Sequence, residues 1–209
     1  LSIGLYTATI MKIIECGVFE TIRTYRGKLF AVPAHLQRLR QGARALGLAV
    51  PLSNTQMTKA LAAQCRTSGE TRLKISLTQA SVAIESKSWR LPRRISTQGV
   101  AVTTRPGKRT RPSLKRIDRP TEDVAIAWAE QHGYFDALLI DQQAAPECAC
   151  SNLFFIHNGV LYTPNTHILL GITRSVVLQL AKLLLPIRFV TPTITQLYQA
   201  DECFLTRTG

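Results

Sequence analysis

Apolar and polar positions in the first half of the chain alternate between strand-like and helix-like spacing. Apolar residues on both sides of Gly27 predict a β-hairpin over residues 17–32, with the glycine in the turn. Pro33 opens a predicted helix whose leucines recur every three or four residues and which ends near Gly47. Further patterns in this half predict a helix over 54–65 and strands over 72–78, 81–86 and 100–104.

The second half opens with a connector of different character. Residues 105–120 contain three prolines and seven basic residues, which is typical of an exposed loop between domains. Because this segment lacks aromatic residues for base stacking, we favour a solvated loop over a nucleic-acid-binding segment. The patterns that follow predict a helix over 121–132, a strand over 136–141, a hairpin of 153–157 and 160–162 around Asn158-Gly159, a helix over 174–185 capped by Thr173, and a strand over 202–206.

The composition of the chain is that of a globular protein with an excess of basic over acidic residues. Hydrophobic residues make up 45% and charged residues 19% of the chain, which excludes disorder and fibrous folds. The 26 Lys and Arg residues against 13 Asp and Glu residues leave a formal net charge of +13. This excess favours nucleic acid, an anionic surface or a small acidic substrate as partner, without choosing among them.

The cysteines and the lengths of the apolar runs indicate the cellular compartment in which the protein works. The five cysteines are scattered, and Cys148 and Cys150 form the single close pair, so we expect reduced thiols, no metal site and a cytoplasmic protein. Apolar runs fall far short of the ~20 residues that span a bilayer, so we expect no membrane partner. The chain begins at Leu1 and stops at Gly209 after an apolar run, so we expect truncation at one or both ends.

Four segments, taken in order, carry a resemblance to one enzyme family. They are Gly17-Val-Phe-Glu-Thr-Ile-Arg23 with Gly27, His35-Leu-Gln-Arg-Leu39, Pro146-Glu-Cys-Ala-Cys-Ser-Asn-Leu-Phe154, and Tyr162-Thr-Pro164 leading to Leu169-Leu-Gly-Ile-Thr-Arg174. In order and content they resemble the fold-type IV pyridoxal-phosphate enzymes. That family includes branched-chain and D-amino acid aminotransferases and 4-amino-4-deoxychorismate lyases, and the resemblance extends from about Gly17 to Gly209.

The resemblance implies an α/β (α+β) fold in two domains. We expect a small α+β domain over residues 1–106, an interdomain connector over 107–120 and a β-rich pseudo-barrel cofactor domain over 121–209, incomplete at its C-terminus. The cofactor implied is pyridoxal 5′-phosphate, held between the domains. Members of the family usually form homodimers, so we expect a homodimer.

Lys115 resembles the lysine that forms the Schiff base with the cofactor. The family's lysine precedes a helix that ends in a glycine, and a strand then starts at an acidic residue. Lys115 stands 18 positions before Gly133, 21 before Asp136 and 32 before Glu147, in agreement with the family's spacing. The resemblance therefore implies that Lys115 is both the covalent anchor and the general base.

The resemblance also implies a set of cofactor-binding and substrate-binding residues. Glu147 resembles the carboxylate that keeps the pyridine nitrogen protonated, and Arg38 resembles the phosphate-binding arginine. The backbone amides of Ile172 and Thr173 would lie at a helix N-terminus, where unpaired donors favour an anion. The remaining matches are Thr208 against the phosphate and Phe19 in the substrate pocket.

Several positions depart from the family's pattern. Ile14 stands where the family usually has a tyrosine that faces the active site, and Pro120 would delay the helix after the lysine. Cys148 replaces the usual glycine after the glutamate. Arg207 puts a long cation where a small turn residue is expected beside the substrate. Cofactor binding is therefore better supported by the sequence than turnover is.

The leading functional expectation is transamination between a branched-chain-like α-amino acid and a 2-oxo acid through Lys115. Cys148, and Arg119 four positions after Lys115, also resemble the 4-amino-4-deoxychorismate lyases, which eliminate pyruvate and yield 4-aminobenzoate. A third possibility is a catalytically impaired basic protein that binds nucleic acid or another partner through residues 105–119. The retained Lys115, Glu147 and Arg38 oppose this last interpretation.

Overall fold

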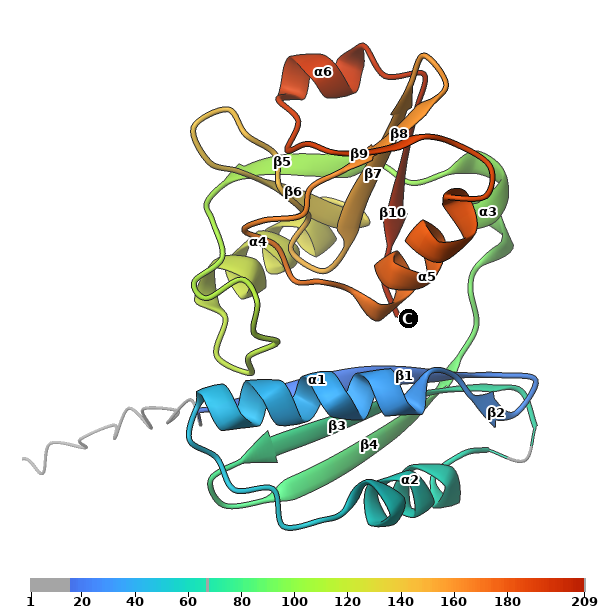
Figure 1. Cartoon of the computed structure of the whole chain (residues 1–209), viewed down its shortest axis with the longest axis vertical. Helices are drawn as coiled ribbons and strands as arrows, with labels where there is room; N and C mark the ends of the chain where they lie inside the picture. Colours follow the sequence, from blue (N-terminus) through green and yellow to red (C-terminus); the bar gives the residue numbers. More distant parts are fainter. Residues whose placement is uncertain (1–15, 67, 209) are drawn as a thin grey trace, which may run out of the picture.

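The protein is described by a computed structural model that covers residues 16–66 and 68–208. The chain folds into two halves, which lie one above the other in the view of Figure 1. Residues 17–89 form the lower half, and residues 93–206 form the upper half. A single crossing between them, after the last strand of the lower half, carries the chain upwards (Figure 1).

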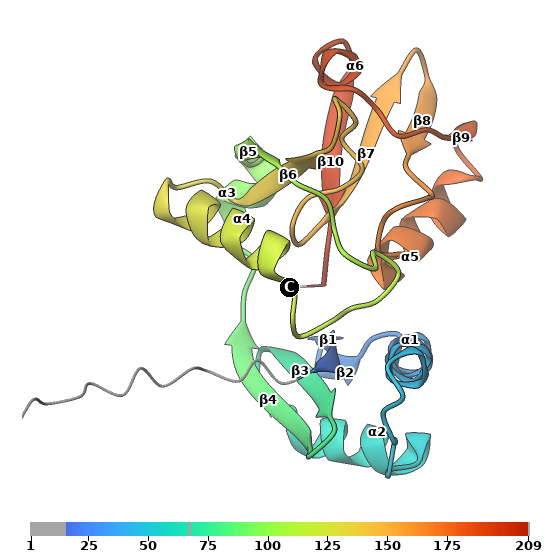
Figure 2. The same ribbon diagram turned by 90° about the vertical axis from the view of Figure 1, so that its left-hand side faces the viewer.

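The lower half is an antiparallel sheet with two helices on one of its faces (Figure 2). The strands pair in the order β2-β1-β3-β4, and helix α1 packs along β1. The elements are β1 (Gly17–Tyr25), β2 (Lys28–Leu29), α1 (Val32–Ala45), α2 (Asn54–Ala63), β3 (Glu70–Thr78) and β4 (Val82–Trp89).

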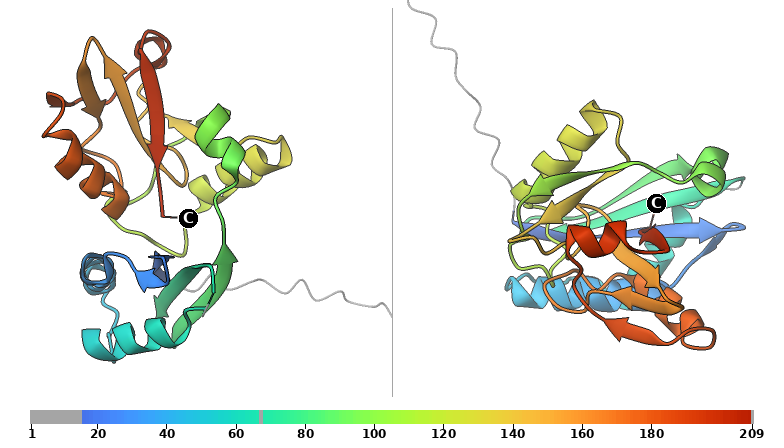
Figure 3. Two further views of the ribbon diagram at one scale, coloured as in Figure 1. Left: turned by 90° about the vertical axis from the view of Figure 1, so that its right-hand side faces the viewer. Right: turned by 90° about the horizontal axis from the view of Figure 1, so that it is seen from above.

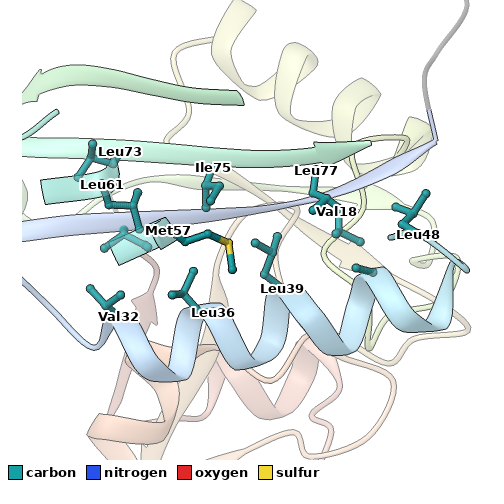
Figure 4. Packing of buried hydrophobic residues seen from close by; sticks show 12 residues of the cluster. Val18, Val32, Leu36, Leu39, Leu48, Met57, Leu61, Leu73, Ile75 and Leu77 are labelled. Carbon is teal, nitrogen blue, oxygen red and sulfur yellow. The ribbon is translucent and has the colours of Figure 1, made fainter. Parts of the chain in front are cut away.

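The core of the lower half lies between this sheet and its helices (Figure 4). Leu36 and Leu39 project from α1 onto Ile75 of β3, and Met57 of α2 closes the cluster. Strand β3 alternates buried and half-exposed residues along most of its length, as a strand covered on one face should. The alternation of apolar and polar residues in the sequence therefore predicts which face of this sheet is covered.

The upper half consists of two sheets and four helices among the described residues. Strands β5 and β6 pair in parallel, and the other sheet has the order β10-β7-β8-β9. The elements are α3 (Arg93–Gln98), β5 (Val102–Pro106), α4 (Pro120–Gln131), β6 (Asp136–Ile140), β7 (Asn152–His157), β8 (Val160–Thr163), α5 (Ile172–Ala181), β9 (Ile187–Phe189), α6 (Ile194–Tyr198) and β10 (Glu202–Thr206).

Three short elements of the upper half are not predicted by the hydrophobic pattern. The predicted N-cap of α5, Thr173, is also wrong. Helix α3, strand β9 and helix α6 are too short for a periodic signal, although Thr193 and Gln196 form a capping box at α6. Helix α5 begins two residues before the predicted start. Its N-cap is Gly171, so Thr173 lies inside the first turn and does not cap the helix.

The connector is less exposed than the sequence predicts. Lys108 and Arg111 are exposed, but residues 114–119 are half-buried because this segment descends onto the lower sheet (Figures 1 and 2). Arg116 forms an isolated bridge with Val18 of β1. The expectation of a wholly solvated loop is therefore wrong, because backbone pairing ties part of it to β1.

The domain division at 107–120 remains a proposal. Strand β5 lies within the segment expected to belong to the first domain, yet it pairs with β6 of the upper half over Val102 to Pro106. This pairing favours a boundary between β4 and β5, ahead of the connector. Within residues 16–66 and 68–208, no helix is long and apolar enough to cross a membrane. The five cysteines form no disulfide.

We expect Leu36→Ala to destabilise the protein by about 2–5 kcal/mol, because it opens a cavity between α1 and the sheet. Leu36 is 1% exposed, whereas Leu184, at 80% exposure, offers a matched control. Leu184→Ala should change the free energy of unfolding by about 0.5 kcal/mol or less. Urea denaturation monitored by circular dichroism measures both values, and equal losses in the two variants would contradict the packing described for the lower half.

Candidate active site

A cavity of about 430 Å³ lies where the two halves meet. Its wall combines side chains of β1, α1 and β3 with side chains of the connector, β7, α5 and the end of β10. Strand β10 runs towards the lower half, which brings its C-terminal end to this junction (Figure 3). The seven residues that the resemblance marks as candidate site residues all line this cavity: Phe19, Arg38, Lys115, Glu147, Ile172, Thr173 and Thr208.

Lys115 is placed by hydrogen bonds between the connector and β1. The Phe19 N–H donates to the Lys115 carbonyl at 3.0 Å, and the Ile117 N–H donates to the Gly17 carbonyl at 2.9 Å. Glycine is needed at position 17, because a Cβ there would lie 2.6 Å from the Leu77 carbonyl oxygen. The Lys115 Nζ consequently lies 4.6 Å from the centre of the Phe19 ring.

Lys115 is electrostatically prepared to act as a neutral amine. Burial lowers its pKa to about 8, because desolvation disfavours the ammonium form. The Glu20 carboxylate opposes this shift, and the positive charges of three nearby arginines add to it. An amine with such a pKa is a nucleophile and a proton acceptor near neutral pH.

A buried carboxylate orients Arg38 at the cavity wall. Glu20 is fully buried and accepts two hydrogen bonds from Arg38, at 2.6 Å from Nε and 2.8 Å from Nη2. His35 Nδ1 lies 2.8 Å from the second Glu20 oxygen. Burial raises the pKa of Glu20, but the hydrogen bonds from Arg38 and His35 outweigh it and hold the pKa below its ordinary value. Arg38 Nη1 donates to the Leu170 carbonyl at 2.7 Å, so the guanidinium is fixed from two sides.

Glu147 is held by three donors in the floor of the cavity. Its Oε1 accepts from Arg109 Nη1 at 3.1 Å and from the Leu169 N–H at 3.0 Å, while Oε2 accepts from Asn152 Nδ2 at 3.0 Å. The residue is 1% exposed, and this burial raises its pKa to about 7. Arg109 opposes the shift, and its Nε in turn contacts the buried Glu122 at 2.8 Å.

The N-terminus of α5 presents backbone donors to the same cavity. No side chain caps this helix at Gly171, so the amides of Ile172 and Thr173 in its first turn lack a side-chain cap. A Cβ at position 171 would collide with Asn152 Oδ1, so glycine lets β7 approach the helix start closely. The Thr173 hydroxyl lies 3.3 Å from the Thr208 hydroxyl, which joins two predicted site residues.

Sequence reasoning missed several residues of the cavity wall. The sequence predicts a solvated loop around Arg109, yet its side chain is only 6% exposed and pairs with Glu147. Asn152 belongs to the Ser-Asn-Leu-Phe run that carries part of the family resemblance, but the resemblance assigns it no role in the site. Arg72 and Thr206 also line the cavity and had no distinguishing pattern. The departure at Ile14 lies outside the described residues.

The chain belongs to the amino-transferase class IV family, whose sequence profile matches residues 17–209. D-alanine aminotransferase of Listeria monocytogenes is 28% identical over 92% of this chain and 74% of its own length. A Thermotoga maritima protein assigned as a branched-chain-amino-acid aminotransferase is 32% identical over 95% of this chain and 76% of its own length. The chain is therefore similar to enzymes with different amino acid substrates.

Solved structures define the fold and the cofactor of the family. A branched-chain amino acid aminotransferase from T.th., complexed with N-(5′-phosphopyridoxyl)-L-glutamate, gives a TM-score of 0.80 at 25% identity over 92% of this chain and 72% of that chain. A protein assigned as a 4-amino-4-deoxychorismate lyase gives 0.83 at 25% identity over 100% of this chain and 86% of that chain. The α/β fold is thus that of the fold-type IV aminotransferases, which depend on pyridoxal phosphate.

The residues of the cavity fit this cofactor. An aldehyde requires an amine, a pyridine nitrogen requires a carboxyl group, and a phosphate requires several N–H or O–H donors. Lys115, Glu147 and the uncapped start of α5 supply these groups within one cavity, and Arg38 adds a cation. No side chain caps the first turn of α5, so its backbone N–H groups are suited to bind an anion.

We expect Lys115 in cofactor-free protein to react with acetic anhydride along a pH profile whose midpoint lies near 8. The pKa of about 8 means that half of the Lys115 side chains are neutral at that pH, and only the neutral amine reacts. Peptide mass spectrometry with isotopic labelling measures the profile, and the exposed Lys182 in the same digest monitors the reagent. A midpoint near the ordinary value of 10.5 would show that the burial of Lys115 does not control its charge.

Proposed function

We propose that this protein is a pyridoxal-phosphate-dependent aminotransferase that exchanges the amino group between a branched-chain-like α-amino acid and a 2-oxo acid. The convergence of Lys115, Glu147, Arg38 and the α5 N-terminus on one cavity carries this proposal. The family of the chain supports the reaction type, and the relative from Thermotoga maritima supports the substrate class.

The proposed roles follow from the position and charge of each side chain. Lys115 would hold the cofactor through its amine and, once free, would accept and move the substrate's α-proton. Glu147 keeps the pyridine nitrogen protonated, and its own raised pKa of about 7 reflects the buried setting in which it does so. The cofactor, when bound, supplies an electron sink for the charge that develops at the substrate's α-carbon.

The phosphate is assigned to the start of α5. Amides of Ile172 and Thr173 point from the start of α5, where the helix dipole favours an anion. The Thr173 and Thr208 hydroxyls add donors beside them, and Arg38 supplies a fixed guanidinium. Phe19, whose ring contacts the Lys115 amine, is assigned to the substrate pocket.

Assembly and compartment are part of the proposal. The resemblance to fold-type IV enzymes supports a homodimer, whose pockets would borrow residues across the interface. The five cysteines, all without a disulfide, support a reducing cytoplasmic setting. Amino acids and 2-oxo acids are the partners that this family implies.

The second candidate function is elimination of pyruvate from 4-amino-4-deoxychorismate. Cys148 follows Glu147, Arg119 lines the same cavity as Lys115, and the lyase-like neighbour matches the whole chain. Incubation with 4-amino-4-deoxychorismate separates the two reactions. Pyruvate released without an amino acceptor would establish the lyase and overturn transamination.

A purely basic binding role has less support. The connector that would form its nucleic-acid footprint is paired to β1, and Arg109 within it is occupied by Glu122 and Glu147. Salt-sensitive binding to nucleic acid by a protein that takes up no pyridoxal phosphate would restore this interpretation.

We expect pyridoxal phosphate followed by borohydride to leave a stable mass adduct on Lys115. Its lowered pKa and its place in the cavity make it the most reactive amine towards the cofactor's aldehyde. Lys115→Ala should lose the visible absorbance band and all turnover, because one residue anchors the cofactor and moves the proton. Peptide mapping distinguishes Lys115 from the control lysines 74, 108 and 182. An adduct on one of these with Lys115 unmodified would mean that the assigned lysine is incorrect.

We expect Glu147→Gln to retain the adduct on Lys115 while turnover falls by about 10²-fold. An amide cannot keep the pyridine nitrogen protonated, so the cofactor would withdraw fewer electrons from the substrate. Glu202→Gln, an identical change at an exposed position of β10, should not alter turnover. Steady-state rates with pyridoxal-phosphate-loaded proteins test this, and unchanged turnover in Glu147→Gln would exclude the assigned role.

A further inference from the structure

Arg109 forms a bridge between two buried carboxylates, and the roles assigned so far give it no task. Its Nε lies 2.8 Å from Glu122 Oε1, and its Nη1 donates to Glu147 Oε1 at 3.1 Å. The side chains of these three residues are at most 6% exposed. Because buried ion pairs contribute little net stability, the bridge is better explained by its effect on the groups around it.

The backbone brings Arg109 to this place through a close approach between the connector and α4 (Figures 1 and 2). As the connector leaves β5, the Gly107 N–H donates to the Ile140 carbonyl at 2.9 Å. Gly107 has a φ of +146°, and a Cβ there would lie 2.8 Å from Thr121 Cγ2. Glycine therefore lets the connector pass the first turn of α4, where Glu122 lies. Arg109, two residues further on, reaches that carboxylate.

The charge of Arg109 opposes the effect of burial on Glu147. Burial raises the pKa of Glu147 to about 7, and the nearby guanidinium of Arg109 is the strongest influence in the other direction. Lys115, Arg174 and Cys148 also interact electrostatically with this carboxylate. Arg109 differs from them because it also donates a hydrogen bond to Glu147.

The same cation acts on Lys115. Burial lowers the pKa of Lys115 to about 8, and the Glu20 carboxylate raises it. The positive charges of Arg38, Arg109 and Arg119 lower the pKa further. A positive charge stabilises a nearby anion and destabilises a nearby cation. Arg109 therefore favours a carboxylate at position 147 and a neutral amine at position 115.

We propose that Arg109, held in place by Glu122, is a positioning residue that keeps Glu147 ionised and Lys115 uncharged. The chemical consequence rests on the proposed function, in which the pyridine nitrogen needs a carboxylate partner and the substrate's α-proton needs a free amine. The inference gives a task to a basic residue of the connector and to an acidic residue of α4. The family resemblance marks neither of them.

Two titrations of the cofactor-free protein test the inference. The midpoint of Lys115 acetylation, near 8 in the unmodified protein, should rise by about one pH unit in Arg109→Gln. Carbon-13 NMR of protein labelled at the glutamate carboxyl carbon follows Glu147, whose resonance is the one that Glu147→Gln removes. Its midpoint, near 7 in the unmodified protein, should also rise by about one pH unit in Arg109→Gln.

The direction in which the Glu147 midpoint moves separates an effect of charge from a loosened cavity. Water that enters a loosened cavity relieves desolvation, which would raise the midpoint of Lys115 and lower that of Glu147. Loss of the Arg109 charge raises both midpoints. A Glu147 midpoint that falls or does not move in Arg109→Gln would overturn the inference.

The connector itself offers a matched control. Arg111→Gln removes the same charge at an exposed position two residues away, and both midpoints should stay where they are. Equal shifts in Arg111→Gln and Arg109→Gln would assign the effect to the charge of the whole connector and refute the bridge. Arg109→Lys retains a cation and should bring both midpoints back towards those of the unmodified protein. If Arg109→Gln does not fold, Arg109→Met removes the charge without adding a polar group and carries the same prediction.

Turnover of the protein loaded with pyridoxal phosphate supplies a further readout. Arg109→Gln should lower kcat by about tenfold or more, while KM for the amino acid changes by less than about threefold. This split is expected because Arg109 acts through the charges of Glu147 and Lys115. A raised KM at unchanged kcat would place Arg109 in substrate binding and overturn the inference.

The failure of this inference can be told apart from the failure of the proposed function. A protein that forms no adduct on Lys115 with pyridoxal phosphate refutes the aminotransferase, and the two titrations of the cofactor-free protein still decide what Arg109 does. A protein that forms the adduct but whose Glu147 midpoint does not rise in Arg109→Gln refutes only the role of Arg109.

Discussion

The short backbone pairing between β1 and the segment around Lys115 is the contact on which the site depends. Two hydrogen bonds, from Phe19 to Lys115 and from Ile117 to Gly17, join the connector to the first strand of the chain. They bring a lysine from the upper half to the sheet of the lower half, next to Glu20 and Phe19. Without this pairing the lysine would be one more solvated cation in a basic loop.

Charge compensation around the cavity follows from that placement. Buried ions persist in a protein when they are paired and hydrogen-bonded, because desolvation otherwise shifts or removes their charge. Glu20 holds Arg38, and Glu122 and Glu147 share Arg109, so these charges form two closed groups with their partners. Lys115, Arg72 and Arg207 lie outside these groups. Their positive charges line the same cavity, and Arg207 Nη1 lies 3.9 Å from the nearest carboxylate oxygen, that of Asp136.

Much of the fold could be predicted from the sequence, because most elements are long enough to show a period. The α1 leucines, the alternation along β3 and the Asn158-Gly159 turn, whose two residues both have positive φ, each predict the observed element. Elements of three to six residues, such as β9 and α6, are too short for such a period.

The site could be predicted from residue spacings that match those of the family, and much less from the sequence pattern around each residue. Lys115 and Glu147 were found because their separation matches the family, and neither has a local signal in its own segment. Arg109 and Arg72 could not be found in that way, because their place in the cavity wall depends on which strands and loops meet in three dimensions. A run of basic residues does not reveal which of its members turns inwards.

The central claim is that the docked connector and α5 build one cofactor site, and a crystal structure of the protein grown with pyridoxal phosphate tests it most directly. The account predicts continuous density from Lys115 Nζ to the cofactor, with the pyridine nitrogen at Glu147 and the phosphate at the amides of Ile172 and Thr173. Density for the cofactor on another lysine, or a phosphate bound away from the start of α5, would contradict it.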